Sequence, residues 1–234
     1  MNLAKQRIDV GLNTNALEPM LAFWQGEIGL PFEHALSVRK GMKQHRHALL
    51  GSVLKINHHR DPLPETAPSG YHELLLAHEG CTNLRQMQDP DGNRVALVPP
   101  GTFGITRIGV RLRVRDVAAH ATFYERALAL PQLTLPAEEG VTSAAAFLAG
   151  DSVLLLEHDA HAPSDATLAG RGWRYITFQI YKVDTEHAHV LAHGAREGRA
   201  PVTLGETARI SMIRDPDGNW IELSQRASIT GELS

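Results

Sequence analysis

The pentapeptide Asp-Pro-Asp-Gly-Asn occurs twice in this chain, at residues 89–93 and 215–219. Each copy precedes a mostly apolar run, at 95–98 and 220–223. Proline fixes φ at one corner and Gly or Asn accepts a positive φ, so each copy predicts a hairpin turn. Two identical turns before two similar segments indicate an internal duplication, which limits the fold to a repeated small unit.

Further matches keep a constant spacing. Segment 8–12 (IDVGL) matches 108–112 (IGVRL), one hundred residues later. The same spacing joins Phe23-Trp24 to Phe123-Tyr124, Leu30-Pro31 to Leu130-Pro131, and Val53-Leu54 to Val153-Leu154. The pentapeptides lie further apart, so the second copy carries an insertion, and we predict a helix over 184–196 within it. We therefore predict two domains, 1–100 and 101–234.

Composition limits the partners and the location of the protein. The 234 residues are 43% hydrophobic, which suits a compact fold, and the net charge of −3 gives no strong attraction to nucleic acid or an anionic membrane. The single cysteine, Cys81, excludes an internal disulfide framework. Because residues 1–7 lack an apolar signal region and no apolar run approaches membrane-spanning length, the expected location is the cytoplasm.

The hydrophobic pattern predicts one unit used about four times. The expected strands of the first half are 8–12, 43–49, 53–58, 71–77, 84–88 and 94–98, with a helix after the first. The second half repeats this order from strand 107–114, with Asp116 as the cap of its helix. The unit is strand–helix–strand–strand–strand, and the second unit of the first half is truncated.

This pattern resembles the vicinal-oxygen-chelate superfamily, which includes glyoxalase I, extradiol ring-cleaving dioxygenases, methylmalonyl epimerase, and fosfomycin- and bleomycin-resistance proteins. The resemblance rests on 114–117 (VRDV) followed by Phe123-Tyr124, on 150–154 (GDSVL), and on the pentapeptide followed by an apolar strand. It implies an α+β fold of tandem βαβββ modules, which form two half-open barrel domains, or cups, with the site on the inner face.

The resemblance also implies where a metal would lie. In that family a divalent cation is held by His, His or Gln, and Glu on the first and last strands of a unit. The matching positions in the second half are Gly109, Leu155, Tyr175 and Glu222, and only Glu222 is a ligand type. One carboxylate cannot hold a catalytic metal. Met212 stands where ring-cleaving members have a tyrosine, which disfavours that chemistry.

In the first half the matching positions are Asp9, Lys55, Glu73 and Ala96. The resemblance implies that Asp9, Lys55 and Glu73 lie together inside the first cup. Such a cluster could anchor a polar substrate or provide a general base. The alternative is a structural ion-paired cluster that fills a former metal site.

His45 and His47 lie on one face of a predicted strand. A three-residue turn at 50–52 would pair His47 with Lys55 and point both histidines into the first cup, whereas a one-residue slip would turn them outward. In the cup they are candidates for substrate contact, or for a metal at a non-standard site with a carboxylate.

Arg111 and Arg113 share the inner side of the second cup with Gly109. Two guanidinium groups beside an apolar pocket suit a carboxylate or phosphate on a hydrophobic body. With Tyr175 and Glu222 they form the expected substrate-binding set. The alternative is that the arginines pair with Glu222 or with surface acids.

Three functions remain open on the sequence. The leading hypothesis is an enzyme that acts on a small oxygenated organic molecule by acid–base chemistry, as an isomerase, epimerase or lyase, with catalytic residues Asp9, Lys55, Glu73, His45 and His47. The alternatives are a non-catalytic drug- or metabolite-binding protein of the same fold and a metal-dependent ring-cleaving dioxygenase. The expected cofactor is none or a divalent metal at a non-standard site. The expected partners are a small molecule and a second copy of the chain in a homodimer.

Overall fold

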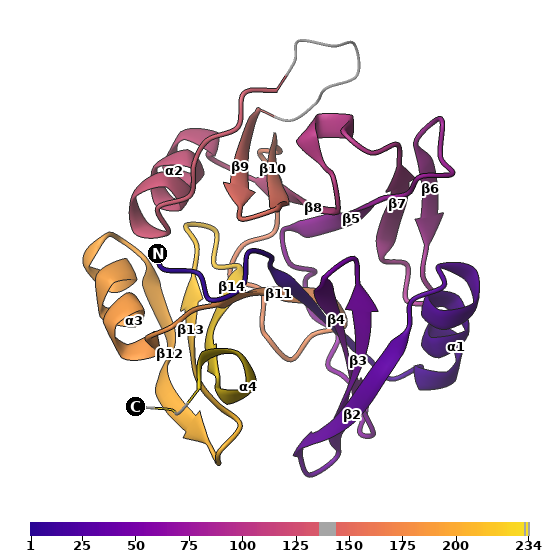
Figure 1. Ribbon diagram of the computed structural model, residues 1–234, viewed down its shortest axis with the longest axis horizontal. Coiled ribbons are helices and arrows are strands. Elements are labelled where there is room, and N and C mark those ends of the chain that lie inside the picture. The colour runs from indigo at the N-terminus through magenta and orange to yellow at the C-terminus, as the bar shows by residue number, and fades with distance from the viewer. Residues whose placement is uncertain (136–143, 232, 234) are drawn as a thin grey trace.

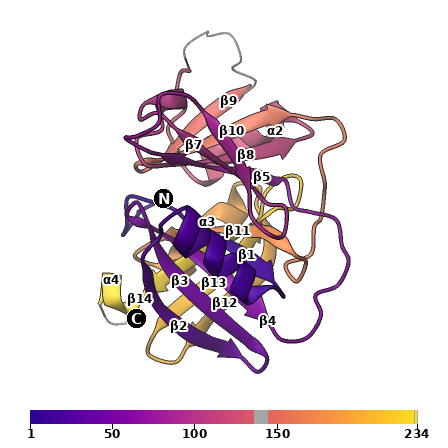
Figure 2. The ribbon, with the colours of Figure 1, turned by 90° about the vertical axis from the view of Figure 1, so that its right-hand side faces the viewer.

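The chain folds into two curled β-sheets, one above the other in Figure 2, with short helices beside them (Figure 1). This computed structural model describes residues 1–135, 144–231 and 233. The α+β class and the repeated unit are confirmed.

The larger sheet has eight strands in the order β12-β13-β14-β11-β1-β4-β3-β2. Its strands from the start of the chain are β1 (Asp9–Thr14), β2 (Phe32–Arg39), β3 (Met42–Leu49) and β4 (Ser52–His59). Those from the end are β11 (Gly172–Gln179), β12 (Arg196–Leu204), β13 (Ala208–Arg214) and β14 (Trp220–Arg226). We call the concave face of this sheet the large cup.

The smaller sheet has six strands in the order β6-β7-β5-β8-β10-β9. These are β5 (Tyr71–Ala77), β6 (Arg85–Gln88), β7 (Arg94–Val98), β8 (Ile108–Val114), β9 (Ala145–Ala149) and β10 (Ser152–His158). We call its concave face the small cup. The unit that contributes β5, β6 and β7 contains no helix, in agreement with the predicted truncation.

The two aligned helices are built alike. Helix α1 (Leu17–Leu21) continues into a π-helical segment, η1 (Ala22–Glu27), and α2 (Val117–Thr122) continues into η3 (Phe123–Ala127). Each segment places an edge-on aromatic pair in the core, with ring centroids 5.2 Å apart in both copies. As predicted, Asp116 caps α2 through Ala119 N–H. The other helical elements are η2 (Thr102–Gly104), α3 (Val183–Ala192) in the insertion, and α4 (Ala227–Thr230).

The sheets do not follow the predicted division at residue 100. β1 pairs with β4 and with β11, so the first unit of the chain shares a sheet with the last unit. β5 pairs with β8, so the two middle units share the other sheet. Residues 60–70 connect β4 of the larger sheet to β5 of the smaller one, whereas residues 99–107 connect β7 to β8 within the smaller sheet, where β5 lies between them. Sequence matching identified the units but not their pairing.

One apolar core joins both sheets and the helices. It includes Val10 and Leu54 of the larger sheet, Leu74 and Val110 of the smaller, and Trp24 and Tyr124 of the helical segments. Successive side chains of a strand point to opposite faces. The neighbours of these residues, among them Lys55 and Glu73, therefore face into the two cups.

The two pentapeptide turns tie the sheets together reciprocally. Asn93, in the turn before β7, accepts a hydrogen bond from Trp173 N–H at the start of β11, at 3.2 Å. Asn219, in the turn before β14, accepts one from Gly70 N–H just before β5, at 2.7 Å. A Cβ atom at Gly70 would meet Arg113 O and the Asn219 amide, so this approach requires glycine. Each repeated turn thus anchors the other sheet.

A buried histidine supports the second turn. His120 of α2 is fully buried, and its Nε2 lies 3.4 Å from Asp215 Oδ2 and 3.7 Å from Asp217 Oδ2. Burial by itself lowers the pKa of His120, but the hydrogen bond and charge of Asp215 outweigh it, so the pKa is raised above 6.5. In the first turn Arg171 Nε lies 4.0 Å from Asp91 Oδ1, and burial raises the pKa of Asp89 to about 6.

We expect the free energy of unfolding to fall as pH rises above about 6.5 because of His120. Its raised folded pKa means that its stabilisation is fully present below the unfolded value of 6.5 and is lost as pH rises through the folded pKa. A single proton can contribute a slope of at most about 1.4 kcal/mol per pH unit. Urea unfolding of wild type and His120→Gln from about pH 6 to about pH 9 measures this slope of the free energy of unfolding with pH. Equal slopes in the two proteins would contradict the assignment.

Candidate functional site

Four central strands bring polar side chains together on the floor of the large cup. Lys55 of β4 donates to Thr177 Oγ1 of β11 at 2.6 Å and to Glu222 Oε1 of β14 at 2.8 Å. Lys55 is 3% exposed, and the Glu222 side chain is 15% exposed. Glu222 Oε2 accepts no hydrogen bond from any residue that the structure describes. The floor thus holds a buried ammonium beside a carboxylate that reaches the cup.

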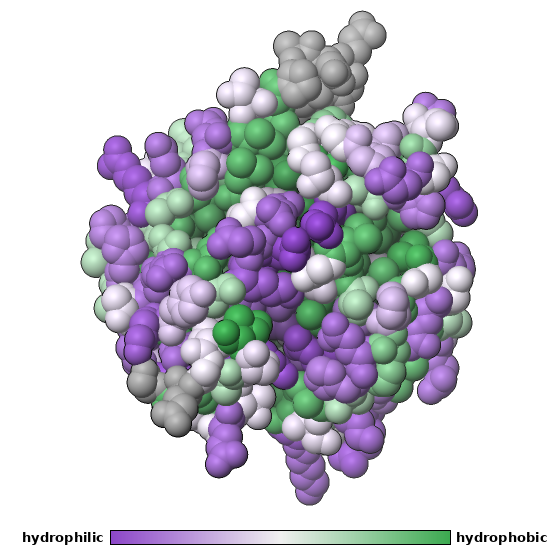
Figure 3. All heavy atoms as spheres, viewed as in Figure 1, coloured by the Kyte–Doolittle hydropathy of each residue, from purple (hydrophilic) through white to green (hydrophobic). Residues whose placement is uncertain are grey.

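The face viewed in Figure 3 has a hollow near its middle, surrounded by hydrophilic side chains. In the same view of Figure 1 this region lies over β11, β1 and β4, between α4 and the β2–β3 hairpin. Of the floor side chains, Glu222 keeps an exposed fraction of 15%, whereas Lys55, Thr177 and Asp9 are buried.

Asp9 lies on the same floor but is fully engaged. Its oxygens accept hydrogen bonds from Lys5 Nζ at 2.6 Å, Val53 N–H at 3.0 Å and Gln179 Nε2 at 3.1 Å. It is 1% exposed. These bonds join β1 to β4 and β11, so Asp9 holds the central strands in place.

Tyr175 of β11 covers the part of the floor where β1 has a glycine, Gly11. Its ring lies directly over Gly11, where any side chain would overlap it. Its hydroxyl accepts from Asn57 Nδ2 at 3.2 Å and from Gln44 Nε2 at 3.4 Å. Burial, reinforced by the charge of Glu222, raises the pKa of Tyr175 far above 10, so the hydroxyl stays neutral. Lys55 Nζ lies 5.3 Å from the ring centre, within cation–π range.

The predicted register of the first hairpin is wrong by one residue. Leu49 pairs with Ser52, so the turn has two residues, Leu50 and Gly51, with φ of 51° and 90°. Such a turn needs positive φ at both positions and usually contains Asn or Gly. The leucine at the first position therefore gave no indication of a two-residue turn in the sequence. As a result Arg46, not His47, pairs with Lys55 and faces the large cup.

His45 and His47 consequently point away from the large cup. His47 pairs with Leu54 and is fully buried, with its Nε2 2.9 Å from Gln25 Nε2 of η1. Burial lowers the pKa of both histidines, which favours their neutral forms. The predicted placement of these histidines beside Lys55 is therefore incorrect.

Glu73 does not join Asp9 and Lys55 either. It lies on β5, in the small cup, with Oε2 3.5 Å from Arg111 Nε and Oε1 3.6 Å from Arg94 Nε. The prediction placed all three residues in one cup because it assumed that the first half of the chain forms a single sheet.

The expected substrate-binding set is divided in the same way. Tyr175 and Glu222 lie in the large cup, whereas Arg111 and Arg113 lie in the small one. Arg111 Nη1 is 2.9 Å from Glu157 Oε1. Arg113 lies 4.0 Å from Glu157 and 3.9 Å from Asp159, so the alternative of pairing with nearby acids holds for both arginines.

The rest of the small cup is filled by apolar side chains. The cluster consists of Leu75, Ala96, Val98, Ile105, Ala146, Val153 and Leu155. The Ile105 side chain occupies the space above Gly109 that a Cβ atom would take. The small cup therefore leaves little room at the positions where the resemblance implied metal ligands.

The large cup does not fit the divalent metal that the resemblance implies. Its four central strands present Asp9, Lys55, Thr177 and Glu222, and one of these side chains is itself a cation. The ammonium lies 2.8 Å from Glu222, where it would repel a metal, and Asp9 already accepts three hydrogen bonds. Among the described residues, no three His, Cys, Asp or Glu side chains gather closely enough to hold a metal ion.

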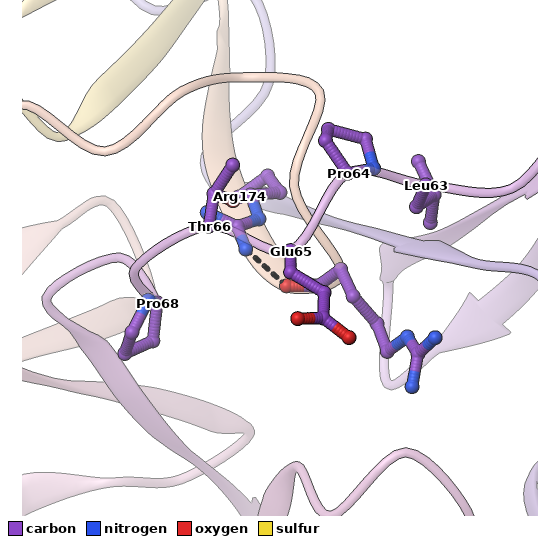
Figure 4. Close-up of a pocket in the computed structure, with 7 residues that line it drawn as sticks. Leu63, Pro64, Glu65, Thr66, Pro68 and Arg174 are labelled. Carbon is purple, nitrogen blue, oxygen red and sulfur yellow. Dashed lines mark hydrogen bonds between the residues drawn. The ribbon is translucent and has the colours of Figure 1, made fainter.

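A pocket of about 270 Å³ lies outside this site, between loop 63–68 and the start of β11 (Figure 4). Its buried Arg174 donates to the carbonyl oxygens of Ala67, Thr167 and Arg171. Burial lowers the pKa of Arg174 to about 10. Because these backbone bonds tie two loops together, we assign this arginine a structural role.

Sequence reasoning missed Thr177 and Arg46. Thr177 lies opposite Asp9 across β1 and β11, a pairing that is visible only once the first and last units share a sheet. Arg46 required the correct hairpin register.

Comparison with known proteins agrees with this fold. The sequence profile described as Glyoxalase/Bleomycin resistance protein/Dioxygenase superfamily matches residues 104–223, more than half of the chain. Glyoxalase I from Zea mays has a TM-score of 0.74 at 16% identity, covering 94% of this chain and 92% of that one. A Bacillus subtilis protein with a provisional dioxygenase assignment has a TM-score of 0.70 at 12% identity, covering 100% and 90%. No curated protein sequence matches the chain.

Across the described part of the chain, every helix is too short or too polar to cross a membrane.

Proposed function

The chain belongs to the Glyoxalase/Bleomycin resistance protein/Dioxygenase superfamily, and from this premise we propose that the large cup is the active site of an enzyme that moves a proton on a small oxygenated organic substrate. Isomerisation, epimerisation and lyase reactions all begin with such a step. The observation that carries the proposal is the contact between the Lys55 ammonium and Glu222, on the floor of the cup.

Lys55 supplies the positive charge in this proposal. An ammonium has three N–H donors, and two of them bind Thr177 and Glu222. The third is available to a substrate carbonyl oxygen. A donor fixed in a buried site stabilises the negative charge that develops on that oxygen during reaction.

Glu222 supplies the base. Its Oε1 is held by Lys55 and Thr177, which leaves Oε2 for the substrate. Oε2 removes the proton from the carbon next to the carbonyl, and the electron pair moves to the oxygen facing Lys55 to form an enolate. Return of the proton to a neighbouring atom or to the opposite face gives an isomer or epimer, and loss of a β-substituent gives an elimination product. No step requires a redox partner.

Deuterium incorporation in D₂O, followed by proton NMR, tests this proposal. The probes are glyceraldehyde, dihydroxyacetone, lactaldehyde and pyruvate, each with an exchangeable C–H next to a carbonyl. We expect wild type to accelerate exchange in at least one, and Glu222→Gln to reduce the rate by about 10²–10⁴-fold. Glu73→Gln, which changes a buried carboxylate of the small cup, is the matched control and should retain the rate.

Retained exchange in Glu222→Gln, or no exchange with any probe, would overturn the proposal. Binding without exchange would favour the second candidate, a non-catalytic binding protein. A specific feature supports that candidate, because Tyr175, Met212 and Trp220 form an apolar cluster beside the floor. The homodimer also stays a prediction, which size-exclusion chromatography with light scattering would test.

A further inference from the structure

Two arginines of the large cup face its interior, and neither forms an ion pair with an acidic side chain that the structure describes. Arg46 lies opposite Lys55 on β3, is 5% exposed, and donates through Nη1 to the neutral Gln44 Oε1 at 3.1 Å. Its Nε is buried and has no hydrogen-bond partner among the described residues. Buried guanidinium groups are normally paired with an anion, so Arg46 needs an explanation.

Arg226 is the second of these arginines. It ends β14, on the same side of the strand as Glu222 and Ser224, and it is half-buried. Within the described chain, neither Arg226 nor Arg46 has a carboxylate within 4 Å. Burial and then the charge of Arg46 lower the pKa of Arg226, which agrees with two guanidinium groups facing one region.

The charges on the floor do not balance. Lys5 pairs with Asp9, and Lys55 pairs with Glu222. Arg46 and Arg226 are left over, so the floor has an excess of positive charge. Asp9, Glu222 and Glu33 also act on Arg226 and oppose the lowering of its pKa, but none of them forms an ion pair with it in the described structure.

We propose that Arg46 and Arg226 form an anion-binding subsite of the large cup and that its ligand is a small organic acid, with a carboxylate or phosphate group held by the two guanidinium groups. A planar guanidinium matches both groups through paired N–H donors. The anion would neutralise the excess charge and leave the oxygenated end of the ligand toward Lys55 and Glu222. This proposal rests on the proposed function of the same cup and narrows its substrate class.

Isothermal titration calorimetry at low ionic strength tests the subsite with three probes. Malonate carries carboxylates, inorganic phosphate represents phosphate esters, and malonamide is the uncharged counterpart of malonate. We expect one-to-one binding of malonate or phosphate to wild type and none of malonamide. Arg226→Gln and Arg46→Gln should each weaken anion binding by about tenfold or more, because each removes a charged hydrogen-bond donor. The relative affinity of the two anions identifies which group the subsite prefers.

Arg113→Gln is the matched control, because it removes an arginine of the small cup, and it should leave anion binding unchanged. Arg46 is buried, so its variant is checked by circular dichroism. If that variant does not fold, the half-buried Arg226 decides the test. The proposal is overturned if wild type binds neither anion at about 10 mM, if Arg226→Gln binds them as tightly as wild type does, or if Arg113→Gln shows the same loss.

Glu222→Gln separates this proposal from the proposed function. It should keep or strengthen anion binding while it loses proton exchange. Anion binding that depends on Arg226, with no exchange in wild type, would leave the subsite in place and remove the enzyme assignment.

Discussion

Replacing Lys55 by methionine is expected to lower the free energy of unfolding by about 3 kcal/mol. Breaking a buried ion pair by removing one partner costs about 3–5 kcal/mol, since the other charge stays buried without compensation. The lower end applies because the Glu222 side chain keeps 15% exposure. Urea unfolding monitored by circular dichroism measures the loss.

A double variant and a surface control sharpen this test. Lys55→Met/Glu222→Leu removes both charges and should recover most of the loss, since an apolar pair of similar volume often replaces a buried ion pair without cost. Arg60→Met breaks the exposed pair with Asp61, whose side chains are 68% and 80% exposed, and should change stability by about 0.5 kcal/mol or less. A loss below about 1 kcal/mol in Lys55→Met would show that Glu222 is solvated despite the contact.

The sequence was sufficient to predict the unit of the fold but not the assembly of the units. Segments 8–31 and 108–131 were predicted to share a strand and a helix because their apolar residues recur at the same spacing, and both form these elements. The pairing of β1 with β11 could not be predicted in this way. It depends on which sheet each unit joins after the connections 60–70 and 99–107, and a repeat alignment contains no such information.

For the candidate site as well, the sequence was sufficient to identify individual residues but not to predict which of them lie together. Lys55 and Glu222 were identified one by one, from their positions in separate units, and their contact follows from the pairing of the outer units. Glu73 was assigned to the wrong cup for the same reason. The hairpin register failed for a local reason, because Leu50 adopts a positive φ that its side chain disfavours. Because of that one residue, Arg46 rather than His47 lies on the inner face of the strand. The wall of the cup therefore presents a guanidinium group where an imidazole was expected.

Asn219→Ala is expected to lower the free energy of unfolding by about 2–4 kcal/mol. Asn219 is 1% exposed, accepts from Gly70 N–H at 2.7 Å and donates to Asp215 Oδ2 at 2.9 Å. Alanine leaves the buried Gly70 N–H unpaired, which costs about 1–3 kcal/mol, and removes a hydrogen bond to the charged Asp215, whose Oδ2 keeps His120 as a neighbour at 3.4 Å. Chemical denaturation measures the loss, with Asn83→Ala in an exposed loop as the control, for which a change within about 0.5 kcal/mol is expected.

The equivalent change in the first turn tests whether the two links act as a pair. Asn93 is 9% exposed and accepts from Trp173 N–H at 3.2 Å, a longer bond, so Asn93→Ala should cost less than Asn219→Ala. If each link independently joins the two sheets, the losses add within about 0.5 kcal/mol in the double variant. If the sheets separate once one link is lost, the second substitution adds little. Losses near zero in both single variants would show that the apolar core alone holds the sheets together, and that the repeated asparagines contribute only to their own turns.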